Sequence, residues 1–171
     1  PYTAKYLDKV GLFEGGVHRM AYLFRPTARG CIMGAGSFAG DPPGLCPVCR
    51  QGSVMRFYQW VRTVDRAQPA QDAVTIPGPR TVRFAASRVH PCPDTQKTVW
   101  RLNGRAIAAG TDEVDVTFGD LPKYELTFTV TDETAFIRPD PPFAQFPVAE
   151  VGWTVTNAAA SASGIATPKR S

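Results

Sequence analysis

Apolar and polar residues alternate with a period of two through much of the chain after residue 80. The first such stretch places Val82, Phe84 and Ala86 on one face. Because successive side chains of a strand point to opposite faces of a sheet, this alternation predicts a strand that is buried on one side. Further strands are expected at 98–102, 136–138 and 150–156. Two more stretches repeat the alternation, at Val114, Val116 and Phe118 and at Tyr124, Leu126, Phe128 and Val130.

Turn residues join these stretches into one expected domain. Asn103-Gly104 follows the 98–102 stretch and is the pair best suited to the positive φ angles of a two-residue hairpin turn. Short strands joined by Gly, Pro and Asn turns, with Trp100 on an early strand, predict an immunoglobulin-like β-sandwich over residues 74–157. We expect the Trp100 indole to lie against the apolar face of the 124–128 strand. Cys92 is the only cysteine in this region, so apolar packing must hold the two sheets together.

A helical pattern of apolar residues occurs just before residue 66. Apolar residues recur there at the spacing of one helical face, which predicts a helix over 53–64 with Ser53 as its N-cap. The stretch 67–73 is small, polar and contains a proline, as is typical of a linker. Residues 1–66 are therefore expected to form one part, followed by the linker 67–73, the sandwich 74–157 and a flexible Ala, Ser and Gly rich tail, 158–171. The helical positions are Val54, Phe57, Tyr58, Val61 and Val64.

Composition and charge narrow the possible partners. The 171 residues are 43% hydrophobic and 20% charged, as in a protein with a packed core. The net charge of +4 forms no basic stripe, so no nucleic-acid partner is expected, and no apolar run reaches the roughly 20 residues of a membrane span. The chain starts without a signal-peptide core and has four cysteines, an even number. We therefore expect a mature product or a piece of a longer protein, secreted to the periplasm or the outside.

The cysteines allow several kinds of chemistry. Cys46-Pro47-Val48-Cys49 has the spacing of a redox pair, of half a zinc ribbon, or of two cysteines bonded to different partners. No βαβ pattern surrounds it and no second such motif follows. A structural disulfide between Cys31 and either Cys46 or Cys49 is preferred, since closing a loop of about 15 residues stabilises by roughly 3 kcal/mol in the entropic model. Cys92 would remain free or pair with the cysteine left over.

No self-sufficient catalytic site is expected in this chain. A catalytic zinc needs about three protein ligands, whereas the chain has two histidines, His18 and His90, on different predicted parts. We therefore expect no metal bound by this chain alone. Ser37 and Ser53 lack a nearby histidine base. The carboxylates near turns are an alternative calcium site, but such residues usually are solvated or cap amides; they are Asp112, Glu113, Asp115 and Asp140.

Four motifs follow one another in the first fifty residues. They are Gly11-Leu12-Phe13-Glu14-Gly15-Gly16, Tyr22-Leu23-Phe24-Arg25-Pro26, Cys31-Ile32-Met33 and Cys46-Pro47-Val48-Cys49. This series resembles the end of the catalytic domain in the IgA-peptidase-like family of bacterial zinc metallopeptidases. That family has Gly-Leu-Phe-Glu-Gly, Arg-Pro, Cys-x-Met and a closing Cys-Pro-Val-Cys before a final helix. The resemblance covers about residues 7 to 65.

The resemblance implies a fold and a function. It implies an α+β fragment, the end of a metzincin-like catalytic domain with its closing helix, ahead of the all-β sandwich. Met33 looks like the methionine beneath the zinc site, and Glu14 and Arg25 would shape the wall. The zinc ligands and the general-base Glu of the family lie upstream and are absent here. The chain alone would then be inactive, and its partners would be the upstream catalytic half and a protein or peptide substrate.

A further resemblance concerns the predicted β-sandwich. The segment from Tyr124 to Glu133, with Thr-Val-Thr-Asp near its end, is similar to the late strand of polycystic-kidney-disease-type and related immunoglobulin-like modules. IgA-peptidase-like enzymes can carry β-sandwich modules after the catalytic domain. The alternative function is a non-catalytic structural or adhesive protein that keeps a peptidase remnant and self-assembles through its sandwich edges. A redox role for Cys46 and Cys49 is a third hypothesis.

Overall fold

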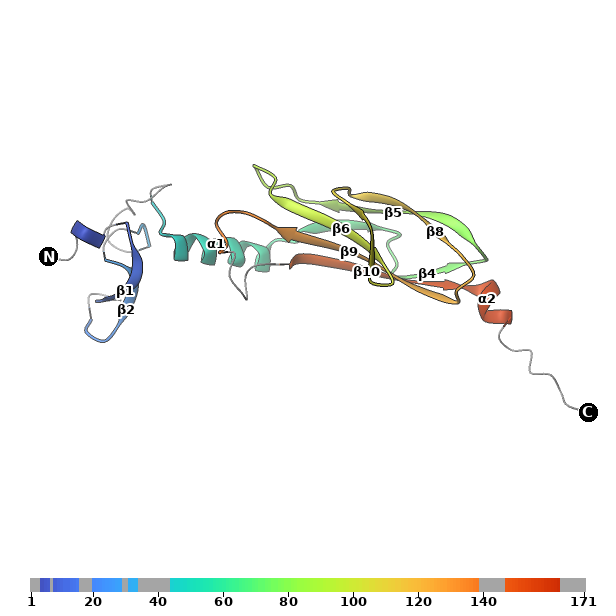
Figure 1. Cartoon of the computed structure of the whole chain (residues 1–171), viewed down its shortest axis with the longest axis horizontal. Helices are drawn as coiled ribbons and strands as arrows, with labels where there is room; N and C mark the ends of the chain where they lie inside the picture. Colours follow the sequence, from blue (N-terminus) through green and yellow to red (C-terminus); the bar gives the residue numbers. More distant parts are fainter. Residues whose placement is uncertain are drawn as a thin grey trace, which may run out of the picture. The chain divides into compact units, whose positions relative to one another are not determined.

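The computed structural model describes residues 4–6, 8–15, 20–28, 31–33, 44–138 and 147–163. Strands dominate these residues, so the protein is β-rich. The chain divides into two compact units (Figure 1). The first unit consists of Pro1–Trp60 with Ala135–Asp140, and the second consists of Val61–Thr134 with Pro141–Ser171.

The first unit contains one small sheet and one long helix. A short 3-10 helix, η1 (Ala4–Tyr6), precedes β1 (Val10–Glu14), which pairs antiparallel with β2 (Phe24–Thr27). The helix α1 (Pro47–Trp60) follows. None of the described helices combines the length and the apolar character needed to span a membrane.

The prediction for α1 is wrong at both ends. The helix begins at Pro47 rather than Ser53, and it ends at Trp60 rather than residue 64. Pro47 starts it because the fixed φ of proline suits the first helical position, and the Arg50 N–H donates the first helical hydrogen bond to the Cys46 carbonyl, 2.9 Å. Ser53 therefore lies inside the helix and does not cap it. Val64 continued the helical spacing in the sequence, but it begins a strand of the second unit.

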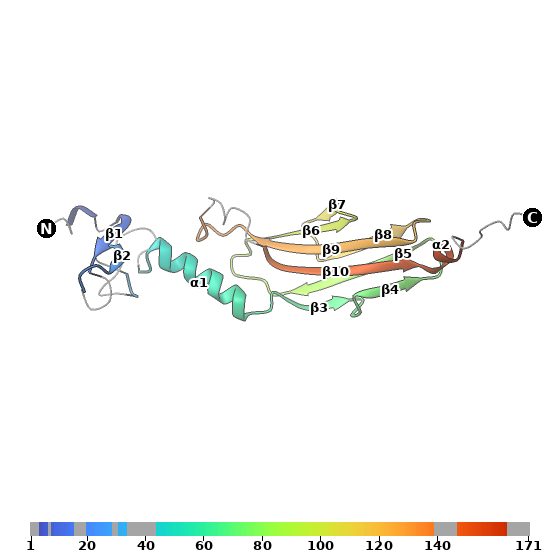
Figure 2. The ribbon, with the colours of Figure 1, turned by 90° about the horizontal axis from the view of Figure 1, so that it is seen from below.

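The second unit contains two sheets. The larger has five strands in the order β4-β10-β9-β6-β7, and the smaller has three in the order β3-β5-β8. All neighbours are antiparallel except β4 and β10, which run parallel (Figure 2). The strands are β3 (Val64–Gln68), β4 (Ala73–Ile76), β5 (Arg80–Arg88), β6 (Gln96–Leu102), β7 (Arg105–Ala109), β8 (Glu113–Phe118), β9 (Lys123–Asp132) and β10 (Pro147–Asn157).

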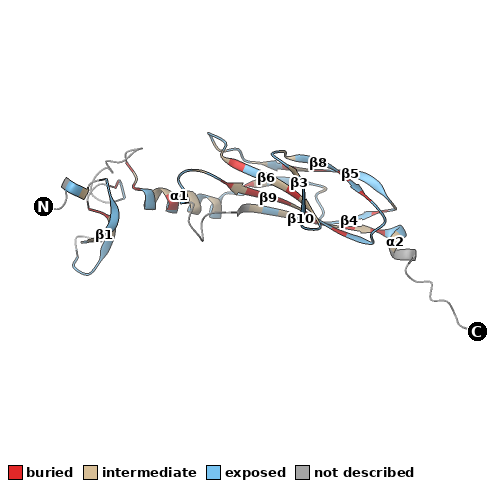
Figure 3. Ribbon diagram, in the orientation of Figure 1, coloured by how far each residue is buried: buried red, intermediate tan, exposed pale blue. Residues whose placement is uncertain are grey.

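Aromatic side chains from both sheets form the core of the second unit. Phe84 on β5 lies edge-on to Trp153 on β10, with ring centroids 5.3 Å apart. Trp100 stacks on Trp153 at 5.6 Å and contacts Phe128 at 4.6 Å. The side chains of Trp100, Phe84 and Phe128 are fully buried. The strands of this unit accordingly include buried stretches (Figure 3). The expected packing of Trp100 on the 124–128 strand is thus confirmed at Phe128.

Most predicted strands are confirmed, and so is the hairpin. Asn103 and Gly104 have φ angles of 49° and 79° between β6 and β7, as a type I′ turn requires. The expected strand at 136–138 is wrong, because these residues form a turn that belongs to the first unit. There the buried Ile137 lies beside Arg138, whose backbone N–H and Nε donate to the Gln51 Oε1 of α1.

The boundaries differ from the expected linker and tail. Ala67 and Gln68 of the expected linker end β3, Ala73 begins β4, and the units divide at Trp60. Residues 158–163 of the expected tail form the helix α2 (Ala158–Ser163). The Asn157 side chain caps this helix, since its Oδ1 accepts from the N–H groups of Ala159 and Ala160 at 3.1 and 3.4 Å.

Candidate functional site

Three of the four cysteines lie together in the first unit. The sulfur atoms of Cys31, Cys46 and Cys49 all lie within 4.8 Å of one another. Cys46 and Cys31 are buried and Cys49 is half-buried. We call these three residues the cysteine cluster. Among the described residues, it is the group whose ligand atoms lie close enough together to hold a metal ion.

The start of α1 positions two members of the cluster. Cys46 precedes the first helical residue and Cys49 lies three positions later, so both side chains lie on the same face of the first turn. Cys31 reaches them because the Ile32 N–H donates to the Gly44 carbonyl at 3.2 Å. Gly44 has a φ of 110°, which an L side chain rarely adopts, and an added Cβ would lie 3.2 Å from Ile32 Cδ1. A glycine is therefore needed at the position that joins the two segments.

Hydrogen bonds make the three thiols unlike one another. Burial disfavours a thiolate at Cys31 and so raises its pKa. The backbone N–H groups of Cys46 and Met33 and the neighbouring thiols donate to its sulfur, and together these hydrogen bonds outweigh burial. The pKa of Cys31 is therefore lowered. The Cys46 N–H lies 3.4 Å from that sulfur. Burial, followed by the hydrogen bonds to Cys31 and Cys46, raises the pKa of Cys49 to about 12. Cys31 is therefore the hydrogen-bond acceptor of the cluster, and its thiol ionises before that of Cys49.

The predicted disulfide partners are near one another, but no bond joins them. All four cysteines are free in the structure, so a Cys31 bridge to Cys46 or Cys49 stays a prediction. A disulfide would connect two of the three sulfurs, whereas a metal ion could bind all three. Cys92 lies in the second unit, is exposed and does not belong to the cluster.

Two other residues singled out by the resemblance, Glu14 and Arg25, lie on the paired strands β1 and β2. Glu14 Oε1 accepts from the Tyr22 N–H at 3.0 Å, which joins the end of β1 to a residue just before β2. Arg25 Nη2 donates to the Ala28 carbonyl at 2.5 Å, and its Nε is buried without a hydrogen-bond partner among the described residues. Met33, two residues after Cys31, has a side chain that is 74% exposed.

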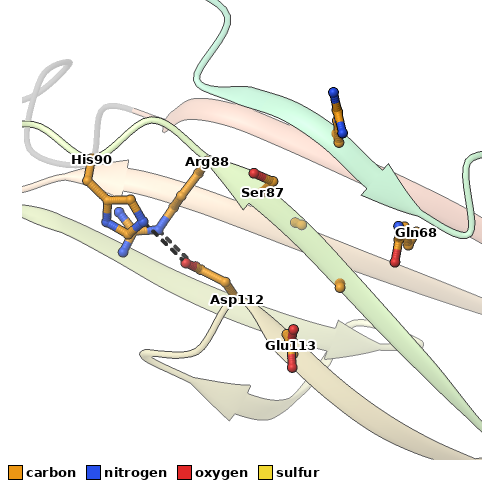
Figure 4. Close-up of a pocket in the computed structure, with 9 residues that line it drawn as sticks. Gln68, Ser87, Arg88, His90, Asp112 and Glu113 are labelled. Carbon is orange, nitrogen blue, oxygen red and sulfur yellow. Dashed lines mark hydrogen bonds and ion pairs between the residues drawn. The ribbon is translucent and has the colours of Figure 1, made fainter.

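A second cluster of polar side chains lies at one end of the smaller sheet, where β5 ends and β8 begins. Arg88 at the end of β5 donates from Nε to Asp112 Oδ1 at 2.8 Å and from Nη2 to Asp94 Oδ2 at 3.0 Å. His90 Nδ1 lies 2.8 Å from Asp94 Oδ2 and its Nε2 lies 3.6 Å from Asp112 Oδ2. Figure 4 shows Arg88 and His90 pointing toward Asp112, at the side of a hollow of about 410 Å³. We call Arg88, His90, Asp94 and Asp112 the arginine cluster.

The arginine cluster has the properties of a structural link. Hydrogen bonds from Arg88, and then from His90, hold the pKa of Asp94 well below its usual range. Asp94 is therefore ionised, and both Asp94 and Asp112 are paired with Arg88, so that neither is placed as an unpaired base. Glu113 likewise pairs with Arg83. The sequence left a calcium site at the carboxylates near turns as an alternative. Of these carboxylates, Asp112 is paired with Arg88 and Glu113 with Arg83.

The remaining candidate residues can be placed only in part. His18, Ser37 and Asp140 lie outside the described residues. Ser53 lies within α1, and His90 belongs to the second unit. The sequence did not predict that Cys31 joins Cys46 and Cys49 as the third member of one cluster. It also did not predict the arginine cluster. Arg88, His90, Asp94 and Asp112 follow no regular spacing in the sequence, so the sequence offers no signal that they meet.

Comparison with known proteins finds no match for this chain. No family model, no curated protein and no solved structure matches it. The function must therefore be argued from the chain's own residues.

Proposed function

We propose that this chain is the C-terminal portion of a secreted zinc metallopeptidase of the IgA-peptidase-like family. The observation that carries the proposal is the way the four motifs lie relative to one another. The first two form the paired strands β1 and β2, with Phe13 opposite Arg25, and the last two meet at the cysteine cluster. Motifs that are separated in the sequence thus occur in one small unit, as consecutive parts of a single site wall would.

The roles follow from the contacts of each residue. Glu14 and Arg25 are engaged with backbone groups of the hairpin, which suits residues that shape a wall and do not react themselves. Met33 is anchored through its backbone N–H to the Cys31 sulfur, while its thioether stays exposed. An anchored, exposed thioether is suited to forming an apolar floor under metal ligands that another segment provides.

The exposed apolar side chains of the first unit agree with a missing neighbour. Leu12 and Tyr22 are 84% and 87% exposed, and Phe24, Ile32 and Met33 are also largely exposed. Burying large apolar side chains such as these against another segment would be favourable by about 25 cal/mol per Å² of apolar surface. The occupant in this proposal is the upstream catalytic half, which would carry the zinc ligands and the general-base Glu. In the intact enzyme, zinc-activated water would attack the peptide carbonyl.

The second unit would be an immunoglobulin-like accessory module. Its strand order, with β3-β5-β8 facing β4-β10-β9-β6-β7, supports this, as does the buried Trp100 on β6. The Tyr124 hydroxyl near the start of β9 accepts from the Leu121 N–H at 3.0 Å. This contact resembles the tyrosine corner of immunoglobulin-like domains.

The test is to recover the upstream coding sequence and express the longer protein. We expect a His-Glu-x-x-His motif upstream, a bound zinc, and peptide hydrolysis that is lost when the motif's Glu is replaced by Gln. The chain of 171 residues is the matched control and should not hydrolyse peptides. An upstream sequence without zinc ligands, or peptide hydrolysis by the short chain alone, would contradict the proposal. A fixed oligomer without hydrolysis would instead support the assembly alternative.

A further inference from the structure

We propose that Cys31, Cys46 and Cys49 together bind a thiophilic divalent metal ion, of which Zn²⁺ is the type, and that this ion joins the start of α1 to the segment after β2. The proposal uses only the geometry of the cysteine cluster. It does not depend on the peptidase proposal, whose zinc ligands would come from another segment.

The distances between the sulfurs suit a tetrahedral thiolate site. A zinc ion binds thiolates at about 2.3 Å, which places two such sulfurs about 3.8 Å apart. The three sulfurs of the cluster already lie within 4.8 Å of one another. Small side-chain rotations would therefore complete three of the four positions. Cys49 is the half-buried member, so its side offers access for the ion and for a water molecule as the fourth ligand.

The surroundings of the cluster favour thiolates. The Cys46 and Met33 N–H groups both donate to the Cys31 sulfur, and the cluster lies at the N-terminus of a helix of 14 residues, where the macrodipole favours negative charge. Two adjacent thiolates repel each other in the absence of an ion. A dication removes that repulsion. On binding, the three S–H bonds ionise, the protons go to solvent, and three S–metal bonds form with no change of oxidation state.

A metal accounts for the cluster better than a disulfide does. A disulfide would join two sulfurs and leave the third beside it without a role, whereas chelation uses all three. The described residues of the first unit also form only a small apolar core. Among its described residues the buried apolar side chains are Ala28, Cys31, Cys46 and Ile137, so that half of this small core consists of cluster members. Units with so small a core usually need a cross-link or a metal.

The first experiment measures metal content. The full chain is purified with reductant and without chelator, and zinc is determined by elemental analysis. We expect about one zinc per chain, and we expect Co²⁺ added to the stripped chain to give thiolate-to-cobalt charge-transfer absorption. A chain that retains no zinc and gives no such absorption would overturn the proposal.

Variants assign the ion to the cluster. Cys31→Ser and Cys49→Ser should each weaken zinc binding at least about tenfold in competition with a chromophoric chelator, a typical loss for removing a ligand or its support. Cys92→Ser is the matched control and should bind zinc like the unmodified chain, because Cys92 is exposed and outside the cluster. Equal zinc binding by Cys31→Ser, or loss of binding in Cys92→Ser, would contradict the assignment.

A thiol count on the unmodified chain does not depend on any variant folding. The chain is prepared without oxygen, denatured with chelator but no reductant, and alkylated. The proposal predicts that all four cysteines are labelled, whereas a disulfide leaves only two. Two labelled cysteines in a zinc-free chain would establish the disulfide instead. Zinc at the cluster, together with an upstream coding sequence that lacks zinc ligands, would support this inference and overturn only the proposed function.

Discussion

The two units of this protein are stabilised in different ways. The second unit has a core of buried aromatic rings from both sheets, including Phe84, Trp100 and Trp153. The first unit has few buried apolar side chains among its described residues and exposes several large ones, while its cysteines lie together. Apolar burial stabilises the second unit, whereas in the two proposals a metal ion and a neighbouring segment stabilise the first unit. A unit with a small apolar core is therefore the place to look for other stabilising interactions.

The largest expected effect comes from removing the central ring of the second unit. Trp100→Ala should lower the free energy of unfolding by about 3 to 5 kcal/mol, because it deletes a fully buried indole that contacts Phe128 and Trp153. The measurement is urea unfolding of the second unit followed by circular dichroism. Trp60→Ala is the matched control, since Trp60 is 81% exposed at the end of α1, and it should change the stability of the second unit by less than about 0.5 kcal/mol.

A smaller effect is expected from the arginine cluster. Arg88→Ala should destabilise the second unit by about 2 kcal/mol, because the mostly buried guanidinium is shared by Asp94 and Asp112 and its loss leaves two carboxylates facing each other. Arg83→Ala removes an arginine from the same strand whose pair with Glu113 is exposed. That control should cost less than about 1 kcal/mol. Equal losses in the two variants would show that the arginine cluster is an ordinary surface group.

A single hydrogen bond tests the corner near β9. Tyr124→Phe removes the hydroxyl that accepts from the Leu121 N–H but keeps the ring, which packs on Phe118 at 5.1 Å. We expect a loss of about 1 kcal/mol in thermal or urea unfolding. An unchanged stability would mean that water replaces the hydroxyl without cost.

The smallest predicted effect is a dependence on pH. Arg88 and His90 lower the pKa of Asp94 in the folded protein, so the folded state binds fewer protons than the unfolded state below about pH 4. The stabilisation is complete above that pH and is lost as the pH falls toward the folded pKa. Asp94→Asn should remove this part of the acid sensitivity in urea unfolding at a series of pH values. Solvent reaches about a third of the Asp94 side chain, so the effect is small.

The sequence predicts the second unit well because its strands carry their pattern locally. The alternation around Phe84, Val116 and Leu126 reflects one buried face, and those strands are present. Only the hairpin turn at Asn103-Gly104 indicated β7, and its bounds were not predicted, because Arg105–Ala109 is a short, mostly exposed edge strand without alternation of apolar and polar residues. The expected strand at 136–138 is wrong because Arg138 bonds to Gln51 on α1, and a contact over such a sequence separation leaves no local pattern.

The site is less predictable than the fold. The spacing of Cys46 and Cys49 identifies a pair, and the sequence also named Cys31 as a disulfide partner. It did not reveal that all three sulfurs meet, because that depends on the contact between Ile32 and Gly44 and on where α1 begins. The helical pattern placed that start six residues too late, and so separated Cys49 from the helix that positions it.

One measurement tests most directly whether the two units are held by different means. Hydrogen exchange is followed by mass spectrometry on the zinc-loaded full chain, before and after addition of a chelator. The account predicts that the amides of α1 near Cys49 lose protection when the metal is removed, while those of β6 and β9 keep theirs. Unchanged protection in α1, or an equal loss in both units, would contradict it.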